Sequence, residues 1–244
     1  MVAALVAVAA SAVVVQRLTT PAIRFLEGYW PPPLRGLRRI LTDRARHREE
    51  GMEERWLQLK ARIDGGTATV DDRAEHSRLE SRLRRMPASG YHLPTRVGNT
   101  LRAGETRPMS KYGLNTSALW PHLWLLLPDV VRAEIGQARA ALNAAAAAGI
   151  WALAFTCFTP WAWWAAPAGI GVMLSAYLLW LPARAEVYAD LVEAAFDLYR
   201  TSLYQQLRWP LPVDPQQERR TGDTLSRYLL RGPDDDNPAF DDPR

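Results

Sequence analysis

The polar side chains best suited to chemistry lie between positions 93 and 129, in a stretch rich in arginine, asparagine and tryptophan. Arginine and amide side chains bind anions such as phosphate through charge-assisted hydrogen bonds. The stretch predicts either a site for an anionic lipid headgroup or phosphate, or Arg–Glu pairs that only stabilise a helix, and we favour the second. The candidate ligand-binding residues are Arg96, Asn99, Arg102, Glu105, Tyr112, Asn115 and His122.

Other site chemistries have little support in the sequence. Four histidines are present, none paired with another at the spacing of metal ligands on a helix, and the HExxH motif is absent. The single cysteine, Cys157, excludes a thiolate zinc site. Phosphate-binding glycine motifs and the GxSxG nucleophile motif are also absent. We therefore predict no catalytic residue, no metal and no cofactor.

The elements that must position the candidate residues surround a run of 44 uncharged positions between Arg139 and Arg184. A bilayer core of about 30 Å needs roughly 20 helical residues, so the run can supply two spans. Its middle, PWAWWAAP at 160–167, has proline at both edges, which disfavours one continuous helix. We predict a transmembrane hairpin over 143–182; the alternative is a helical hairpin buried in a soluble core.

Tryptophan marks the expected membrane interfaces, where its amphipathic ring is enriched. Three tryptophans lie in the hairpin tip, and one lies near the opposite interface. Two more fall in the uncharged stretch 112–128, which is too short and too broken for a confident span and predicts an interfacial helix on the inner leaflet. The predicted interface residues are Trp120, Trp124, Trp161, Trp163, Trp164 and Trp180.

The N-terminus begins with about 15 apolar or small residues before Gln16 and Arg17. At 1.5 Å per residue this stretch reaches only about 23 Å, slightly short of a span. No basic residue precedes this stretch, whereas a signal peptide normally begins with a basic region. We favour a membrane helix, and its abrupt apolar start also suggests a truncated longer helix; a cleaved signal peptide and a buried or interfacial helix remain alternatives.

Charge is divided by position. Residues 17–139 hold 22 Lys+Arg and 14 Asp+Glu, net +8, whereas residues 184–244 hold 8 and 12, net −4. Because arginines flank the hairpin and its tip has none, the positive-inside rule places both charged regions in the cytoplasm and the tip 160–167 outside. The basic excess beside the membrane predicts attraction to anionic inner-leaflet lipid, and nucleic acid is not expected as a partner.

The pattern outside the membrane is helical, so the predicted fold class is all-α. Apolar residues recur at helical spacing over 37–63 and 69–86, with Asp64-Gly65-Gly66 between them, which predicts an αα-hairpin. Thr95 predicts the start of a helix that runs to about position 105. A short helix is expected around 221–231. The predicted regions are 1–23, the N-terminal membrane helix; 24–92, the cytoplasmic hairpin; 93–139, the membrane-proximal block; 140–183, the transmembrane hairpin; 184–231, the C-terminal helices; and 232–244, a disordered acidic tail.

A resemblance is carried by LPTRVGNTLRAGE (93–105), the YGLN that follows and WPHLWLLLPD (120–129). This block resembles one shared by uncharacterised integral membrane proteins of high-GC, actinobacterial-type bacteria. LEGYWP (26–31) and AAFDLYRTSLYQQL (194–207) fit the same pattern. The resemblance implies a protein of the cell membrane, but it carries no known activity, so no catalytic residue follows from it.

Three functions remain open at this stage. The first is a non-enzymatic membrane protein whose cytoplasmic helices form a scaffold or regulatory domain, binding a protein partner or forming a homo-oligomer. The second is a lipid-headgroup binder or membrane-associated enzyme that uses the 93–129 block. The third is a subunit of an oligomeric pore or transporter, which the lack of charge inside the predicted spans disfavours.

Overall fold

The computed structural model describes residues 2–233, 238 and 240, without the side chains of residues 2–10 and 12. Regular structure in these residues is helical, and no strand occurs among them, so the predicted all-helical class is confirmed. Short 3₁₀ or π segments join some of the helices: η1 (Pro32–Leu34), η2 (Thr156–Phe158) and η3 (Ala176–Trp180). The α-helices are α1 (Val2–Glu27), α2 (Arg35–Asp64), α3 (Val70–Leu83), α4 (Arg96–Tyr112), α5 (Thr116–Leu126), α6 (Asp129–Phe155), α7 (Ala165–Ser175), α8 (Leu181–Gln206) and α9 (Pro215–Arg231).

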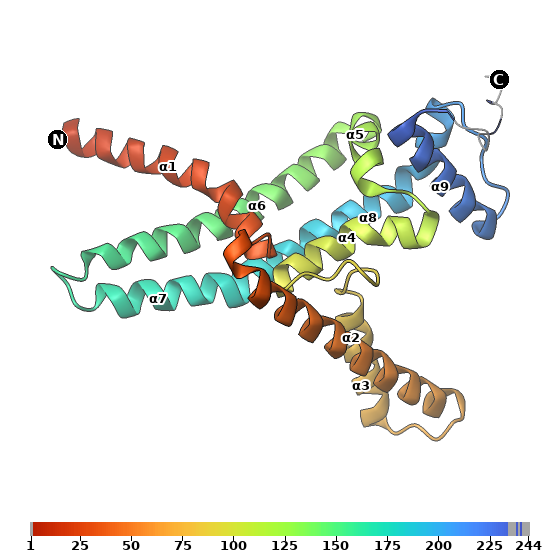
Figure 1. Cartoon of the computed structure of the whole chain (residues 1–244), viewed down its shortest axis with the longest axis horizontal. Coiled ribbons are helices and arrows are strands. Elements are labelled where there is room, and N and C mark those ends of the chain that lie inside the picture. Colours follow the sequence, from red (N-terminus) through yellow and green to blue (C-terminus); the bar gives the residue numbers. More distant parts are fainter. Residues whose placement is uncertain (1, 234–237, 239, 241–244) are drawn as a thin grey trace.

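Arms extend in different directions from one centre (Figure 1). On one side, α7 runs beside the second half of α6, and α1 extends in a similar direction. On the other side, α4 and α8 run together towards α5 and α9, and α2 and α3 form a separate arm (Figure 1). α6 passes through the centre, and α7 continues through it into α8, so these long helices connect the two sides.

Two helices of the described chain are long and apolar enough to cross a membrane: 129–158, which is α6 with η2, and 165–206, which is α7, η3 and α8 in one continuous run. They contact each other along the uncharged segment, where Gly169 fits against the backbone of Ala152 and leaves no room for a side chain. The break between them spans 159–164, shorter than the predicted 160–167. Pro167 lies inside the first turn of α7, where a missing N–H costs no helical hydrogen bond.

The α2–α3 hairpin begins and turns where its sequence predicts, although α3 ends at Leu83 and the predicted pattern ran to 86. α2 ends at Asp64, before Gly65 and Gly66. Thr69 then caps α3: its hydroxyl accepts from the Asp72 backbone N–H, and the Asp72 carboxylate accepts from the Thr69 backbone N–H. Across residues 35–83, all of which the structure describes, Leu59 and Leu79 are the buried side chains.

Two helix boundaries differ from the predictions. Thr95 caps α4 as predicted, but the helix continues to Tyr112 instead of ending near 105, because it tolerates Pro108 and closes only at Gly113, whose φ of +72° suits glycine. α9 begins at Pro215 instead of 221, because the Asp214 side chain caps its first turn and proline suits the first helical position. The predicted disorder of 232–244 falls mostly outside the described residues.

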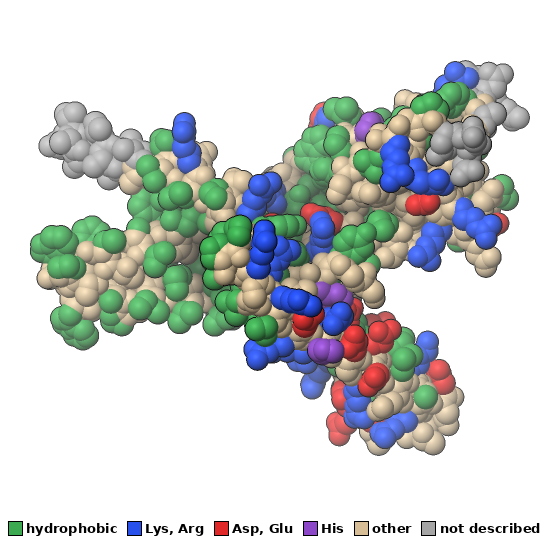
Figure 2. Space-filling model, viewed as in Figure 1, with side chains coloured by type: hydrophobic (Ala, Val, Ile, Leu, Met, Phe, Trp, Pro, Cys, Tyr) green, Lys and Arg blue, Asp and Glu red, His purple; other side chains and the backbone are tan. Residues whose placement is uncertain are grey.

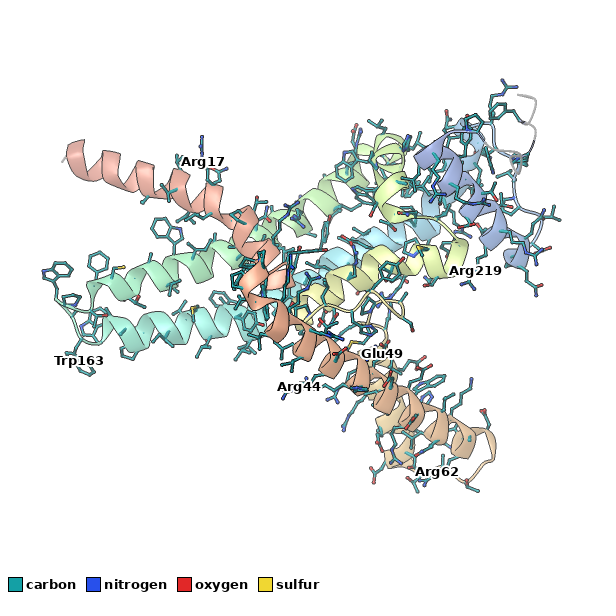
Figure 3. The ribbon with its side chains drawn as sticks, in the orientation of Figure 1. Arg17, Arg44, Glu49, Arg62, Trp163 and Arg219 are labelled. Carbon is teal, nitrogen blue, oxygen red and sulfur yellow. The ribbon has the colours of Figure 1, made fainter. Side chains whose placement is uncertain are left out.

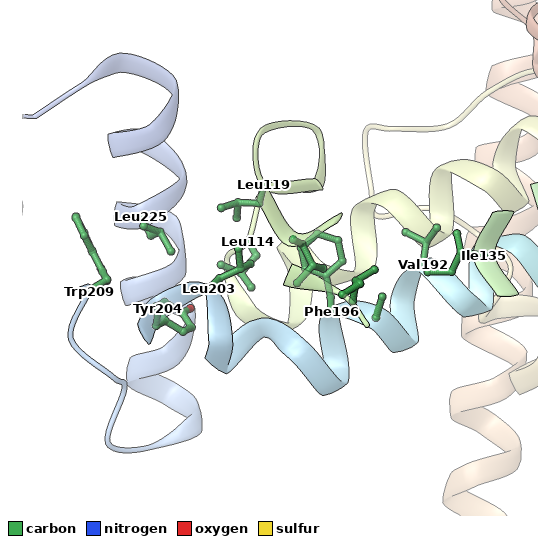
Figure 4. Close-up of a cluster of buried hydrophobic side chains, with 12 residues drawn as sticks. Leu114, Leu119, Ile135, Val192, Phe196, Leu203, Tyr204, Trp209 and Leu225 are labelled. Carbon is green, nitrogen blue, oxygen red and sulfur yellow. The ribbon is translucent and has the colours of Figure 1, made fainter. Parts of the chain in front are cut away.

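The core has two parts. The larger cluster joins α4, α5, α6, α8 and α9 around Phe196, Tyr204 and Trp209 (Figure 4). The smaller cluster lies at the centre, where Ile23 of α1, Val97 and Leu101 of α4, and Leu142 and Leu181 of the two long helices meet. The start of α4 is thus packed at the level where the uncharged segments of α6 and of the continuous 165–206 helix end.

Candidate functional site

The seven predicted site residues do not converge on one cavity. Asn99 is buried, and its side-chain oxygen accepts a hydrogen bond from the backbone N–H of Leu93 at 2.6 Å. Asn115 caps α5 by accepting from the N–H groups of Ser117 and Ala118. His122 is exposed, and its Nδ1 lies 3.2 Å from the carbonyl oxygen of Ala118, one turn earlier. These residues organise local backbone and do not aim at a common ligand.

Arg102 and Glu105 form the local pair that their spacing predicts, with 2.9 Å between Nη1 and Oε2. Arg102 also lies over the ring of Tyr91. Nearby, burial raises the pKa of Glu27 above its usual value; Arg139 opposes the shift, and Glu105 adds to it. These side chains form a charged junction between the end of α1, the middle of α4 and the start of the uncharged part of α6.

The strongest polar contacts cross between α4 and α8, and Glu193 is their centre. Its side chain is only 6% exposed, yet it accepts from Arg107 at 2.5 Å and from Lys111 at 2.6 Å. Burial alone would raise the pKa of Glu193, but hydrogen bonds from Lys111 and Arg107 outweigh it and hold the pKa below its usual value. Sequence reasoning missed this carboxylate, because its partners lie more than 80 positions away.

Two of the predicted site residues join this α4–α8 interface. Tyr112 donates its hydroxyl to Asp197 at 2.7 Å, and burial together with that bond raises the pKa of the phenol. Arg96 is exposed at the start of α4 and reaches Glu186 of α8 at 3.4 Å. Glu186 also pairs with Arg85, at 3.1 Å. The Tyr112–Asp197 and Arg96–Glu186 contacts both help to hold α4 and α8 in register.

The six predicted interface tryptophans fall in two environments. Trp161, Trp163 and Trp164 are exposed at the tip, and Trp180 is exposed at the other end of the second apolar segment; the labelled Trp163 marks the tip in Figure 3. Trp120 and Trp124 are half-buried against the large core cluster, and Trp120 contacts the ring of Phe196. An apolar cavity of 660 Å³ lies beside these two rings, with Arg139 and Tyr188 in its lining. The membrane-interface role of all six stays a prediction.

Arg96 and Asn99 also line a different cavity, of 520 Å³, between the start of α4, α2, and the end of α3 with the segment that follows it. Its other polar lining includes Arg44, Arg48, Arg82 and Arg85, none of which was a predicted site residue. The sequence contains part of the pattern that marks this cavity. One face of α2 lines it with residues that recur at helical spacing: Leu41, Arg44, Ala45, Arg48 and Met52. Their distance from α4 in the sequence concealed the site.

Among the described side chains, no group of three or more His, Cys, Asp or Glu residues could hold a metal ion. The polar side chains of the α4–α8 interface are paired with one another, an arrangement that fixes helices and leaves few groups to act on a substrate. Comparison of the chain with known protein families, curated proteins and solved structures finds no match.

Proposed function

We propose that this chain is a non-enzymatic multi-pass membrane protein that holds a helical scaffold at the cytoplasmic face of the membrane. The observation that carries the proposal is the contrast in surface charge between the apolar hairpin and the charged helices on the other side of the molecule. Figure 2 shows no Lys, Arg, Asp or Glu side chain on the visible face of α7 and of the half of α6 beside it, and blue and red side chains over the α2–α3 arm.

The surface of the hairpin supports insertion into a bilayer. Its exposed side chains include Leu153, Phe158, Ile170 and Leu179, and Trp161 at the tip is 82% exposed. Contiguous apolar surface of this kind is unfavourable in water and favourable in hydrocarbon. The helical backbone satisfies its own hydrogen bonds, which a bilayer core requires.

The orientation follows from the arginines. Arg132 and Arg139 precede the first apolar segment, Arg184 follows the second, and the segment between them has no charge. With positive residues retained inside, α2–α3, α4, α5 and α9 lie in the cytoplasm, and the tip lies outside. The part of α1 up to residue 23 is proposed as a further span, which places the N-terminus outside.

Labelling of single cysteines tests this orientation. In a Cys157→Ser background, Ala162→Cys at the tip should react with a membrane-impermeant maleimide in intact cells. Ser77→Cys on α3, which is exposed in the structure, should react only after the cells are permeabilised. The reverse pattern would overturn the orientation, and equal labelling of both sites in intact cells would overturn membrane insertion of the hairpin.

The scaffold role rests on the α2–α3 arm, which projects from the centre (Figure 1) and presents exposed Leu57 and Val70. We expect this arm to bind a protein partner or a second copy of the chain. Cross-linking in membranes should join the wild-type chain to this partner or to the second copy. The double variant Leu57→Glu, Val70→Glu should give much less of that cross-linked product. Leu230→Glu on α9, also an exposed leucine, is the matched control, and equal retention by both variants would count against the role of the arm.

A further inference from the structure

The 520 Å³ cavity between α2, the end of α3 with the segment after it, and the first turns of α4 carries an unusual concentration of positive charge. Five arginines line it, and among the described residues no Asp or Glu does. Figure 3 places one of them, Arg44, on α2 close to the centre. The arginines are Arg44, Arg48, Arg82, Arg85 and Arg96.

The charge of this cavity is only partly balanced by the protein. Arg85 and Arg96 share a single carboxylate, that of Glu186. Arg44, Arg48 and Arg82 have no ion pair with any described carboxylate. Like charges gathered at one site repel each other, so an anion in the cavity would lower the energy of the whole group. The arginine fork also matches the oxygens of phosphate groups closely.

The base of the cavity adds uncharged donors. Thr95, Asn99 and Thr100 from the first turns of α4 line it, and the free N–H groups of a helix N-terminus attract anions. Thr100 supplies a second observation, although it also lines a smaller cavity that Glu186 and Asp190 border. The residue is only 3% exposed, and its hydroxyl has no hydrogen-bond partner among the described residues. Buried hydroxyls are normally paired, and the oxygen of an anion in this cavity would accept the proton.

The cavity lies beside the proposed membrane surface. Pro94 packs on Gly28, directly after the end of α1, and Gly98 abuts the backbone of Glu27. Val97 and Leu101 pack with Leu142 and Leu181, which lie just inside the two ends of the uncharged run. Lipid phosphates lie at this depth in a bilayer.

We propose that this cavity binds a ligand with one or more phosphate groups, either the headgroup of an anionic lipid or a soluble phosphate compound. Its volume falls in the range of small-molecule sites and exceeds that of one phosphate ion. Several arginines can therefore contact more than one phosphate, or a phosphate with the group attached to it. The lipid source rests on the membrane placement proposed above, whereas the soluble source does not.

The test uses the full chain in nanodiscs of phosphatidylcholine, with two arms. In one arm, pyrophosphate is titrated and binding is measured by calorimetry. In the other, phosphatidylglycerol is added to the bilayer, and the phosphatidylglycerol retained by the chain is measured by native mass spectrometry. Binding in the first arm identifies a soluble phosphate source and binding in the second a lipid headgroup; both support the cavity if the variants below respond as expected.

The cavity variant is Arg44→Gln with Arg48→Gln, and its matched control is Arg35→Gln with Arg39→Gln, which removes the same charge from the same helix outside the cavity. We expect the cavity variant to bind at least about tenfold more weakly, because each lost charge-assisted hydrogen bond weakens binding several-fold. The control should change by less than about threefold, the residual effect of diffuse attraction to phosphates.

Thr100→Val is the second variant, and it separates binding from folding. It removes the unpaired hydroxyl at nearly constant shape, so the ligand-free chain should unfold at the same or a higher temperature while binding weakens several-fold. The proposal is overturned if neither pyrophosphate nor phosphatidylglycerol binds. It is equally overturned if the control double variant loses as much affinity as the cavity double variant.

Discussion

Two helix pairs in this chain use the same chemistry in different surroundings. α4 and α8 are joined by Arg107–Glu193 and Lys111–Glu193, and α2 and α3 are joined by Arg55–Glu75 and Arg62–Asp72. Glu193 is buried, whereas Arg55 and Glu75 are each about 40% exposed. Breaking an ion pair is costly where the remaining charge stays buried and nearly neutral where water replaces the partner.

The apolar contacts follow the same division. At the α4–α8 interface, Gly104 lies so close to Ala189 that a Cβ would collide with its backbone, and the large core cluster continues from there to α9. In the α2–α3 arm, the buried apolar side chains are Leu59 and Leu79. The ring of Trp56 also stacks on that of His76, with 5.2 Å between the ring centroids. We therefore expect the α4–α8 interface to set the stability of the whole chain, and the α2–α3 hairpin to unfold locally without it.

Phe196→Ala should have the largest effect. The ring is fully buried beside Trp120, and its removal leaves a cavity that costs about 3–5 kcal/mol. Thermal unfolding of the chain in detergent micelles, followed by tryptophan fluorescence, measures the loss. Leu198→Ala on the same helix is the control, because Leu198 is exposed and should change stability by less than about 0.5 kcal/mol. Similar losses for the two variants would contradict a core centred on Phe196.

Glu193→Gln should have the second largest effect on global unfolding, about 2 kcal/mol at pH 7. It removes the shortest ion pair of Arg107, and the cost is moderated because Arg107 keeps a longer contact with Asp190, at 3.8 Å, and Lys111 keeps Asp197, at 3.0 Å. The pKa of Glu193 is lowered by folding, so its stabilisation is present above about pH 4.3, the unfolded value, and is lost as pH falls through the folded value.

The measurement is the unfolding temperature of wild type and Glu193→Gln at pH 7 and at pH 3.5. The difference between the two proteins should shrink at the lower pH. Asp190→Asn, one turn earlier and largely exposed, is the control and should show a small difference at both pH values. A constant gap between wild type and Glu193→Gln would show that the carboxylate is not the titrating group.

The sequence predicted the features that depend on neighbours along the chain. The uncharged run defined the two candidate spans, Gly65-Gly66 ended α2, and Thr95 began α4. The Arg102–Glu105 pair was also predictable, because residues three apart share one helical face. These signals act within one or two helical turns, which is the range that sequence patterns report.

Features that depend on tertiary packing were not predictable. α4 passes Pro108 because its contacts with α8 and α9 hold the helix beyond that residue, and no local signal reports those contacts. Arg96 pairs with Glu186, 90 positions away, in place of a neighbour on its own helix. The arginine cavity likewise joins residues of α2, the end of α3 with the segment after it, and α4, so the predicted set contained only Arg96 and Asn99 of its lining.

Leu59→Ala tests whether the α2–α3 arm opens independently. Leu59 is fully buried between the two helices, and its truncation should destabilise the arm by about 2–3 kcal/mol. Hydrogen exchange followed by mass spectrometry should show faster exchange in peptides from 50–83 and unchanged exchange in α4 and α8. Leu57→Ala, an exposed neighbour, should leave both regions unchanged. Faster exchange in α4 as well would mean that the two helix pairs unfold together.

The smallest effect is expected for the exposed pair Arg55–Glu75. Its geometry is bidentate, with 2.9 Å from Nε to Oε1 and 3.0 Å from Nη2 to Oε2, so geometry alone would suggest a strong contact. Water solvates both groups when the pair opens, and salt screens what attraction remains. A double-mutant cycle with Arg55→Ala and Glu75→Ala should therefore give a coupling energy well below that of the Arg107→Ala, Glu193→Ala cycle, and 0.5 M salt should reduce the first more than the second. Equal coupling in the two cycles would show that hydrogen-bond geometry, and not burial, decides the contribution of ion pairs in this chain.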